Sequence, residues 1–457
     1  MTDPLPYIEE HLDRFQEEIF DFLRIPSVSA RKEHRKEMDE AAAWLSEKLD
    51  SAGLRSEVVS TRGHPIVLGE WRDAGPDAPT LLVYGHYDVQ PPEPLHLWDS
   101  PPFEPEIREG RIYARGAADD KGQLYLHVKA FETLLEGGGG LPVNVVLLAE
   151  GEEEVGSPNL IPFVKEHRQR LACDGVVISD TDMFAPDLPA ILFSLRGIAY
   201  FEIRVRGPSG DLHSGTYGGS VTNPANALSD ILASLMNREG RVTVPGFYDD
   251  VVKWDAKTLQ GIEGLPFDEQ AYLEETGAPA LAGEEGYTTL ERRWIRPTCD
   301  VNGLLSGYTG EGAKTVLPAE AMAKVSFRLV PDQDPDTVAE LFRKHVQAVT
   351  ADGVEVETRV LQGGRPWRAK LEGPLYDAAR KALDRAFEKE PVLTGAGGSI
   401  PIVVEFEEIL EAPCLLMGFA WPGANMHAPN EWFPLENVQK GVEALTWFYR
   451  EMGTAAE

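Results

Sequence analysis

The chain has 457 residues and a formal net charge of −32, from 75 acidic and 43 basic side chains. Its length predicts two or more domains, because one hydrophobic core rarely serves so long a chain. The negative charge argues against nucleic acid and anionic membrane surfaces as partners, since both bind basic patches. The three cysteines form no C-x-x-C pair, the apolar runs are too short to span a bilayer, and no signal peptide is visible, so a cytoplasmic location is expected.

The first part of the chain alternates segments with helical periodicity and short apolar runs. Such alternation predicts an α/β domain with helices on both faces of a mixed sheet. Glycines and prolines end several of these segments, as at Gly53 and at the glycine run 137–140. The predicted elements, in chain order, are helices at 7–24 and 35–52, strands at 56–60, 66–71 and 81–84, a helix at 121–135, a strand at 143–148, a helix at 157–171 and a strand at 175–180.

The pattern changes near Gly197, where half-exposed strands begin. A β-α-β-β-α-β order follows, with strands at 199–205, 298–304, 323–330 and 354–361 and helices at 224–236 and 336–350. This order predicts a smaller, ferredoxin-like α+β domain at 197–365, inserted between two parts of a catalytic domain at 1–196 and 366–457. The acidic segment 249–292 shows no readable structure. The first domain resumes with a helix at 376–387, a strand at 414–419 and a helix at 436–452.

Polar groups with metal-binding or acid–base chemistry stand where the apolar strands end. His86 follows the strand at 81–84, a glutamate cluster at 152–154 follows the strand at 143–148, and Asp180 ends the next strand. The carboxyl ends of parallel strands line one crevice of an open α/β sheet, where sites form. Each motif alone also fits an ordinary loop or a solvated charge run, but their shared order and flanking strands favour a site.

The motifs together resemble those of the dinuclear metallopeptidase family that includes carnosinase, aminoacylase, succinyl-diaminopimelate desuccinylase and carboxypeptidase G. The nearest resemblance is to carnosinase-like cytosolic dipeptidases, and it extends over nearly the whole chain. In that family the inserted domain serves as a lid and a dimerisation domain. The matching segments are Gly85 to Pro91, Trp98 to Phe103, Gly116 to Gly122, Glu150 to Ser157, Ile178 to Asp180, Asp211 to Gly215 and Gly397 to Pro401.

The resemblance implies two divalent metal ions per subunit, bridged by Asp119. One ion takes His86 and Asp180 as further ligands, and the other takes Glu154 and His427. Imidazole and carboxylate ligands without thiolate suit zinc, manganese or cobalt, and zinc is the first expectation. Asp88 is expected to orient the imidazole of the nearby histidine as a carboxylate behind the metal.

The resemblance also implies the residues that act on the substrate. Glu153 is expected to be the general base, although an exchange of roles with Glu154 stays open. His213 is expected to reach the active site of the partner subunit in a homodimer and to polarise the scissile carbonyl. The residues implied for binding the substrate carboxylate are Thr315, Arg328 and Ser399.

The predicted function is hydrolysis of the amide bond of a dipeptide or similar small peptide. An N-acyl amino acid hydrolase is the enzymatic alternative, and a catalytically silent, metal-binding dimeric protein is the alternative from another class. Carnosinase-like relatives often carry a glutamate and a histidine where this chain has Ala396 and Gln362. Because either residue could read a substrate's free amine, their absence keeps the N-acyl alternative open.

Overall fold

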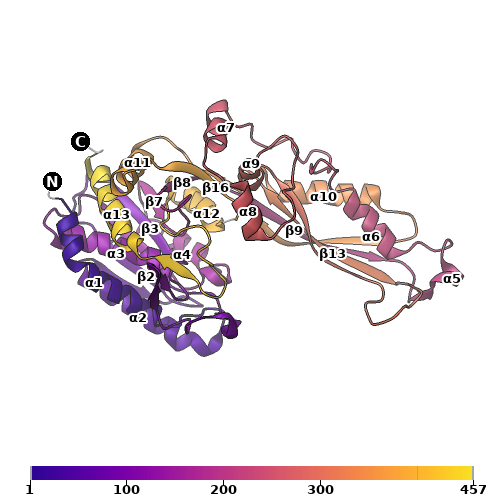
Figure 1. The fold of residues 1–457 in the computed structure, drawn as a ribbon, viewed down its shortest axis with the longest axis horizontal. Helices are drawn as coiled ribbons and strands as arrows, with labels where there is room; N and C mark the ends of the chain where they lie inside the picture. Colours follow the sequence, from indigo (N-terminus) through magenta and orange to yellow (C-terminus); the bar gives the residue numbers. More distant parts are fainter. Residues whose placement is uncertain (1–2, 399, 455–457) are drawn as a thin grey trace. The chain divides into compact units, whose positions relative to one another are not determined.

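The computed structural model describes residues 3–398 and 400–454, and its ribbon is drawn in Figure 1. The chain divides into two compact units: the first holds residues 1–193, 369–393 and 405–457, and the second holds residues 194–368 and 394–404. The chain therefore passes between the units four times: within β8 (Ala190–Leu195), after residue 368, within β16 (Val392–Ala396) and after residue 404. The catalytic role predicted for the outer parts of the chain and the lid and dimerisation role predicted for the inserted part stay predictions.

A six-stranded mixed sheet forms the centre of the first unit, in the order β1-β2-β6-β3-β7-β17. The four strands β6, β3, β7 and β17 run parallel, so their carboxyl ends lie at one edge of the sheet. At the other side of the sheet, β2 pairs antiparallel with β6, and β1 pairs antiparallel with β2. The strands span β1 Arg55–Val59, β2 Ile66–Trp71, β3 Thr80–His86, β6 Asn144–Glu150, β7 Gly175–Ile178 and β17 Cys414–Leu416.

Helices cover both faces of this sheet, which confirms the predicted α/β architecture. Val83, Leu147 and Val177 point to one face and share a core with five helices. Tyr84 points to the other face, where its ring meets Phe406 edge-on at 5.2 Å between centroids. The helices of the first core are α1 Leu5–Leu23, α2 Arg35–Ser51, α3 Lys121–Glu136, α11 Pro374–Phe387 and α13 Glu436–Thr454, whereas Phe406 belongs to α12 Pro401–Leu410.

Helix α3 is buried along almost its whole length, from Lys121 to Leu134. It lies against β3 on one side and against α1 and α13 on the other, which leaves little of its surface to solvent. The start of α3 comes close to the end of β3: a Cβ at Gly85 would lie 2.6 Å from Asp120 Oδ2. Glycine allows this close approach, and the N–H of His86 donates to the same Asp120 oxygen at 3.1 Å, which links the strand end to the helix start.

The second unit contains the predicted ferredoxin-like fold. Its elements follow the order β9 (Gly197–Arg206), α6 (Pro224–Ala233), β11 (Thr298–Ser306), β13 (Glu320–Leu329), α10 (Pro335–Val349) and β14 (Glu355–Gly364). The strands form one antiparallel sheet in the order β11-β13-β9-β14. In its core the rings of Phe201 and Phe342 stack, and the ring of Phe327 meets both edge-on. A separate two-stranded ladder pairs β10 (Leu212–His213) with β12 (Val316–Leu317), and β10 leads directly into the short helix α5 (Ser214–Tyr217).

Several elements had no clear sequence signal. The acidic segment holds three short helices, α7 Ala256–Glu263, α8 Glu269–Thr276 and α9 Thr289–Trp294. Asp255, Asp268 and Thr288 begin them by accepting backbone N–H groups. The strands β8 and β16 form a sheet with β15 (Trp367–Arg368), and β4 (Glu106–Arg108), β5 (Arg111–Tyr113) and β18 (Trp432–Pro434) form another. Helix α4 (Leu160–Glu166) is shorter than predicted.

Among the described residues, none of the helices combines the length and apolarity needed to cross a membrane.

Candidate metal centre

The five side chains predicted as metal ligands all lie in the first unit and come from different elements. His86 is the last residue of β3, and Asp180 follows the end of β7 by two residues. Glu154 lies in a 3-10 turn, Glu153–Val155, which follows β6 after two intervening residues. Asp119 precedes α3, and His427 lies in the loop before β18. The parallel strands thus bring together groups that are far apart in the sequence.

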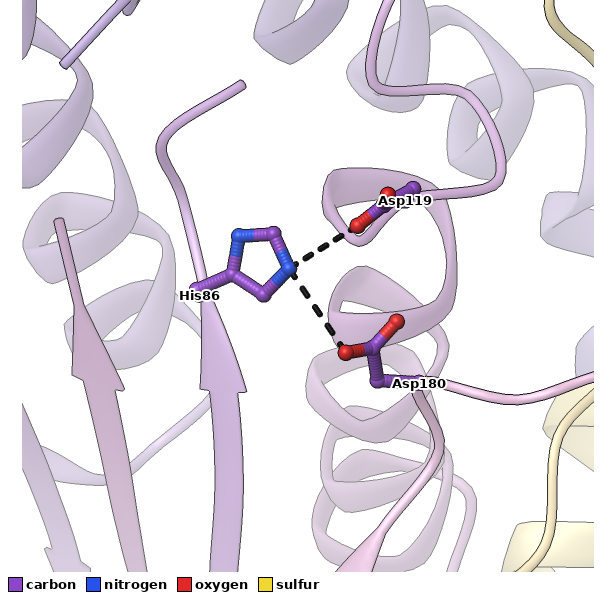
Figure 2. Close-up of side chains that lie close together, drawn as sticks. All are labelled: His86, Asp119 and Asp180. Carbon is purple, nitrogen blue, oxygen red and sulfur yellow. Dashed lines mark hydrogen bonds and ion pairs between the residues drawn. The ribbon is translucent and has the colours of Figure 1, made fainter. Parts of the chain in front are cut away.

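Asp119 stands between two imidazoles and faces each with a different oxygen. Figure 2 shows the first group, in which His86 Nε2 lies 3.0 Å from Asp119 Oδ1 and 3.8 Å from Asp180 Oδ2. In the second group, His427 Nε2 lies 2.8 Å from Asp119 Oδ2 and 3.3 Å from Glu154 Oε2. Within each group the potential ligand atoms all lie within 4.8 Å of one another. These are two overlapping candidate metal sites that share one carboxylate.

The electrostatics of the centre are set by buried carboxylates that lie close to one another and to two imidazoles. Burial raises the pKa of Asp180, and repulsion from Asp119 and Asp120 adds to the shift. Burial opposes ionisation of Asp119, but hydrogen bonds from His427 and His86 hold its pKa well below its usual range. Hydrogen bonds to Asp119 and Glu154 raise the pKa of His427 to about 10. Since buried carboxylates need positive partners, the centre is suited to cations.

Asp88 lies behind the first group and is completely buried. Its Oδ1 is 3.3 Å from His86 Nδ1, and its backbone oxygen is 3.1 Å from the same nitrogen. The carboxylate also accepts the backbone N–H groups of Glu153 and Glu154, at 3.2 and 3.1 Å. Asp88 therefore contacts the back of one imidazole and holds the turn that carries the two glutamates.

The two neighbouring glutamates have different surroundings. Gln90 Nε2 donates to Glu154 Oε2 at 2.7 Å, so this oxygen is fixed beside His427. No hydrogen bond to the Glu153 carboxylate is found among the described residues. Burial raises the pKa of Glu153 to about 7, with His86 opposing the shift and Glu154 adding to it. A carboxylate in such surroundings can exchange a proton near neutral pH.

The remaining predicted site residues belong to the second unit. His213 is exposed and ends β10, and its Nδ1 accepts the backbone N–H of Gly215 at 3.0 Å. Thr315 is exposed on the neighbouring segment and accepts the N–H of Ser214 through its backbone oxygen at 3.1 Å. Arg328 is half-buried on β13, opposite Ile198 of β9. Ser399 lies outside the described residues.

Comparison with known proteins identifies the family. The model of peptidase family M20/M25/M40 matches residues 82–451. The chain belongs to this family. It is a metallopeptidase by that membership, so a divalent metal is the cofactor implied for the buried centre.

Several known proteins are similar to this chain over almost its full length. The Cys-Gly metallodipeptidase dug1 of Schizosaccharomyces pombe is 32% identical, with 98% of each chain covered. The crystal structure of an M20 family metallo-carboxypeptidase from Sulfolobus solfataricus has a TM-score of 0.84 at 32% identity, covering 96% of this chain and 99% of the other. That of human carnosine dipeptidase 1 has a TM-score of 0.81 at 28% identity, covering 99% and 98%. These matches agree with the resemblance seen in the sequence motifs.

Two further residues contact the segments that carry the predicted ligands, and the sequence patterns did not indicate either of them. Gln90 lies inside a recognised motif, yet only the folded chain shows its amide against Glu154. Glu431 lies four positions after His427 and accepts hydrogen bonds from the segment that ends at Asp119. Their contacts join segments far apart in the chain, so local sequence pattern carried no signal for them.

Proposed function

We propose that this chain is a dipeptidase that binds two divalent metal ions and cleaves the amide bond of dipeptides or similar small peptides. Zinc is the first candidate for both ions, with manganese or cobalt as alternatives. One observation carries the proposal: Asp119 faces His86 with one oxygen and His427 with the other, in a member of a metallopeptidase family. Relatives named as dipeptidases support the choice of substrate.

The residues present fit the two ions. Each group offers one imidazole nitrogen and two carboxylates, with Asp119 counted in both. Three protein ligands leave a coordination position open for water or substrate, as catalytic metal sites require. The pKa of His86 is raised well above its usual range: burial opposes the proton, but hydrogen bonds to Asp119 and Asp88 outweigh it. Positive charge is therefore stabilised at the place proposed for a cation.

The bound ions would supply Lewis acidity and a water that is more readily deprotonated. In the proposed reaction, Glu153 accepts the proton of the attacking water and later donates it to the leaving nitrogen. Glu154 is kept from this role by its hydrogen bond with Gln90 and its place beside His427. Asp88 holds the backbone of both glutamates, so the base and the ligand keep their separation.

The substrate is proposed to bind through its free carboxylate. Arg328 suits this task because a guanidinium can form two parallel hydrogen bonds with a carboxylate. Thr315 and Ser399 are proposed to assist it. His213, acting from the partner subunit of a homodimer, is proposed to polarise the scissile carbonyl. Its Nδ1 accepts a backbone N–H, so a neutral ring carries its proton on Nε2, which can donate to a carbonyl oxygen.

The decisive experiment measures hydrolysis by the purified protein after chelation and after reloading with Zn²⁺ or Mn²⁺. A panel of dipeptides, their C-terminal amides, a tripeptide and N-acetyl amino acids identifies the substrate class. Activity on free dipeptides that chelation abolishes and metal restores is expected, with a sharp fall in kcat/KM for the amides. Activity that does not depend on metal would contradict the proposed metal centre. Equal rates on a dipeptide and its amide would contradict the proposed binding of the substrate carboxylate by Arg328.

A second candidate, hydrolysis of N-acyl amino acids, is favoured by two uncharged positions. Ala396 ends β16 and Gln362 lies exposed on β14, and neither side chain is ionisable. If neither position provides a charge for a substrate amine, acetylation of that amine should be tolerated. Comparable kcat/KM on a dipeptide and its N-acetyl form would favour this candidate, whereas loss on acetylation would support the dipeptidase.

A further inference from the structure

Glu431 is a completely buried carboxylate that occupies a ring of hydrogen-bond donors. Its Oε2 accepts from Arg115 Nη1 at 2.7 Å and from the N–H of Gly116 at 2.9 Å. Its Oε1 accepts from the N–H groups of Ala118 and Asp119, at 2.9 and 3.1 Å. Successive backbone N–H groups of this kind form a concave site for an anion. The carboxylate thus fixes the segment that ends at Asp119.

The same residue is fixed to the loop that carries His427. Glu431 comes directly before β18, and its backbone oxygen accepts the N–H of Ala114, which continues the pairing of β18 with β5. The loop closes on itself, since the N–H of Trp432 donates to Ala424 O at 3.0 Å. His427 and Glu431 therefore belong to one short, closed segment, and the Glu431 side chain connects that segment to Asp119.

We propose that Glu431 is a positioning residue that keeps Asp119 and His427 in register for the metal ion they share. This rests on the proposed two-metal function. Among the described residues, the Glu431 carboxylate makes no hydrogen bond or ion pair with a predicted ligand side chain, so it acts through the backbone of Asp119 and through the loop of His427.

The two candidate sites depend on Glu431 to different degrees. The group of Asp119, Glu154 and His427 takes two of its three ligands from segments that Glu431 connects. The group of His86, Asp119 and Asp180 takes only one. Loss of Glu431 should therefore weaken the His427 ion more than the His86 ion. A purely structural Arg115–Glu431 ion pair predicts no such selectivity.

The test is calorimetric titration of metal-free Glu431→Gln with Zn²⁺. A glutamine has one acceptor oxygen, so it must turn an NH₂ group toward either Arg115 or the N–H groups of Ala118 and Asp119. We expect one ion to bind about 10–100-fold more weakly, the usual effect of removing a group that orients metal ligands. The other ion should bind close to wild type. The titration should resemble that of His427→Ala and differ from that of Asp119→Ala, which weakens both ions.

Two controls separate positioning from general damage. Glu284→Gln removes a buried carboxylate bound by Arg296 and Arg241 in the second unit, and should leave both ions unaffected. Asn430 lies in the same loop as His427, and its side chain hydrogen-bonds the backbone of Leu97 and Asp99. Asn430→Gly removes these two bonds and should also retain both ions.

The outcomes distinguish this proposal from the proposed function. If Glu431→Gln does not fold, Glu431→Asp decides, because it keeps the charge but retracts it from the ring of donors. A folded variant that binds both ions as wild type does, or loses both equally, overturns the positioning role. Wild-type protein that binds no Zn²⁺ instead contradicts the proposed function, whatever the variants do.

Discussion

The carboxylate of Asp88 accepts the backbone N–H of Glu153 at 3.2 Å, across 65 positions of sequence. The same carboxylate accepts the backbone N–H of Glu154 at 3.1 Å. Asp88 therefore has a second contact besides the one with the imidazole of His86. It fixes the turn that carries the proposed base and one proposed ligand. The strand end and this turn are therefore positioned by one buried carboxylate.

Asp88→Asn should lower both metal affinity and kcat. Asparagine has one acceptor oxygen, so at least one of the two N–H groups of Glu153 and Glu154 loses its partner. Zn²⁺ affinity should fall about 10–100-fold, as for other groups that orient ligands. Titration of the metal-free variant and steady-state kinetics at saturating metal measure the two effects. Asp73→Asn, on an exposed turn, is the control that should change neither.

Glu153→Gln should keep its metal and lose its turnover. Glutamine preserves the shape of the side chain but cannot accept the proton, so kcat should fall about 10²–10⁴-fold with metal content unchanged. Elemental analysis and kcat are measured together. Glu154→Gln is the comparison, and it should bind the His427 ion more weakly. If Glu154→Gln is instead fully loaded and inactive while Glu153→Gln turns over normally, the two roles are exchanged.

A buried ion cluster between α1 and α3 predicts acid sensitivity of the first unit. Burial opposes ionisation of Glu18, but the hydrogen bond and charge of Lys129 dominate, and its pKa falls from the usual 4.5 to about 2. Because the folded-state pKa is lowered, the stabilisation is complete above about 4.5 and is lost as the pH falls toward 2. Glu18→Gln should therefore destabilise the protein at pH 6 and have a smaller effect at pH 3.

Urea unfolding of metal-free protein at the two pH values measures this difference. Glu17→Gln is the matched control, because its exposed carboxylate pairs with Arg24 at the surface. It should change the free energy of unfolding little at either pH. A Glu18→Gln effect of the same size at pH 6 and pH 3 would contradict the assignment.

The sequence was most informative where structure is local. Apolar periodicity predicted β2 at Ile66–Trp71 with its observed bounds, and α3 to within one residue, since both are encoded in neighbouring side chains. The position of His86 at a strand end also followed from local pattern. The three helices of 249–292 did not, because each is short and α8 has no buried residue to mark a face. A polar N-cap, Asp268, marks the start of α8, whereas α7 and α9 bury few apolar side chains.

Local sequence patterns could not predict the contacts between segments that are distant in the chain. The N–H of Gly116 and the carboxylate of Glu431 meet across 315 positions, and nothing near either residue signals the other. The same holds for Gln90 and Glu154, 64 positions apart. The ligand types were inferred from motif resemblance, whereas the groups that hold them in place depend on the tertiary fold.

His213 offers a test of assembly. If it acts in the partner's site, Glu153→Ala and His213→Ala homodimers should both be nearly inactive, because each site needs one residue from each chain. Mixing the two variants under conditions of subunit exchange should restore about a quarter of wild-type activity. By symmetry, random exchange makes about half the dimers mixed, and each mixed dimer has one intact site of two.

Different affinity tags on the two variants verify that mixed dimers have formed and allow their isolation. Purified mixed dimers should then show about half the wild-type kcat per dimer, since one site carries both lesions and the other carries neither. Mixing wild type with either variant is the control for exchange itself. Verified mixed dimers without recovered activity would mean that His213 acts within its own chain or has no part in the reaction. Recovered activity would agree with the observed ring, which is exposed and whose Nδ1 accepts the Gly215 N–H, so that a neutral ring has its Nε2–H as donor.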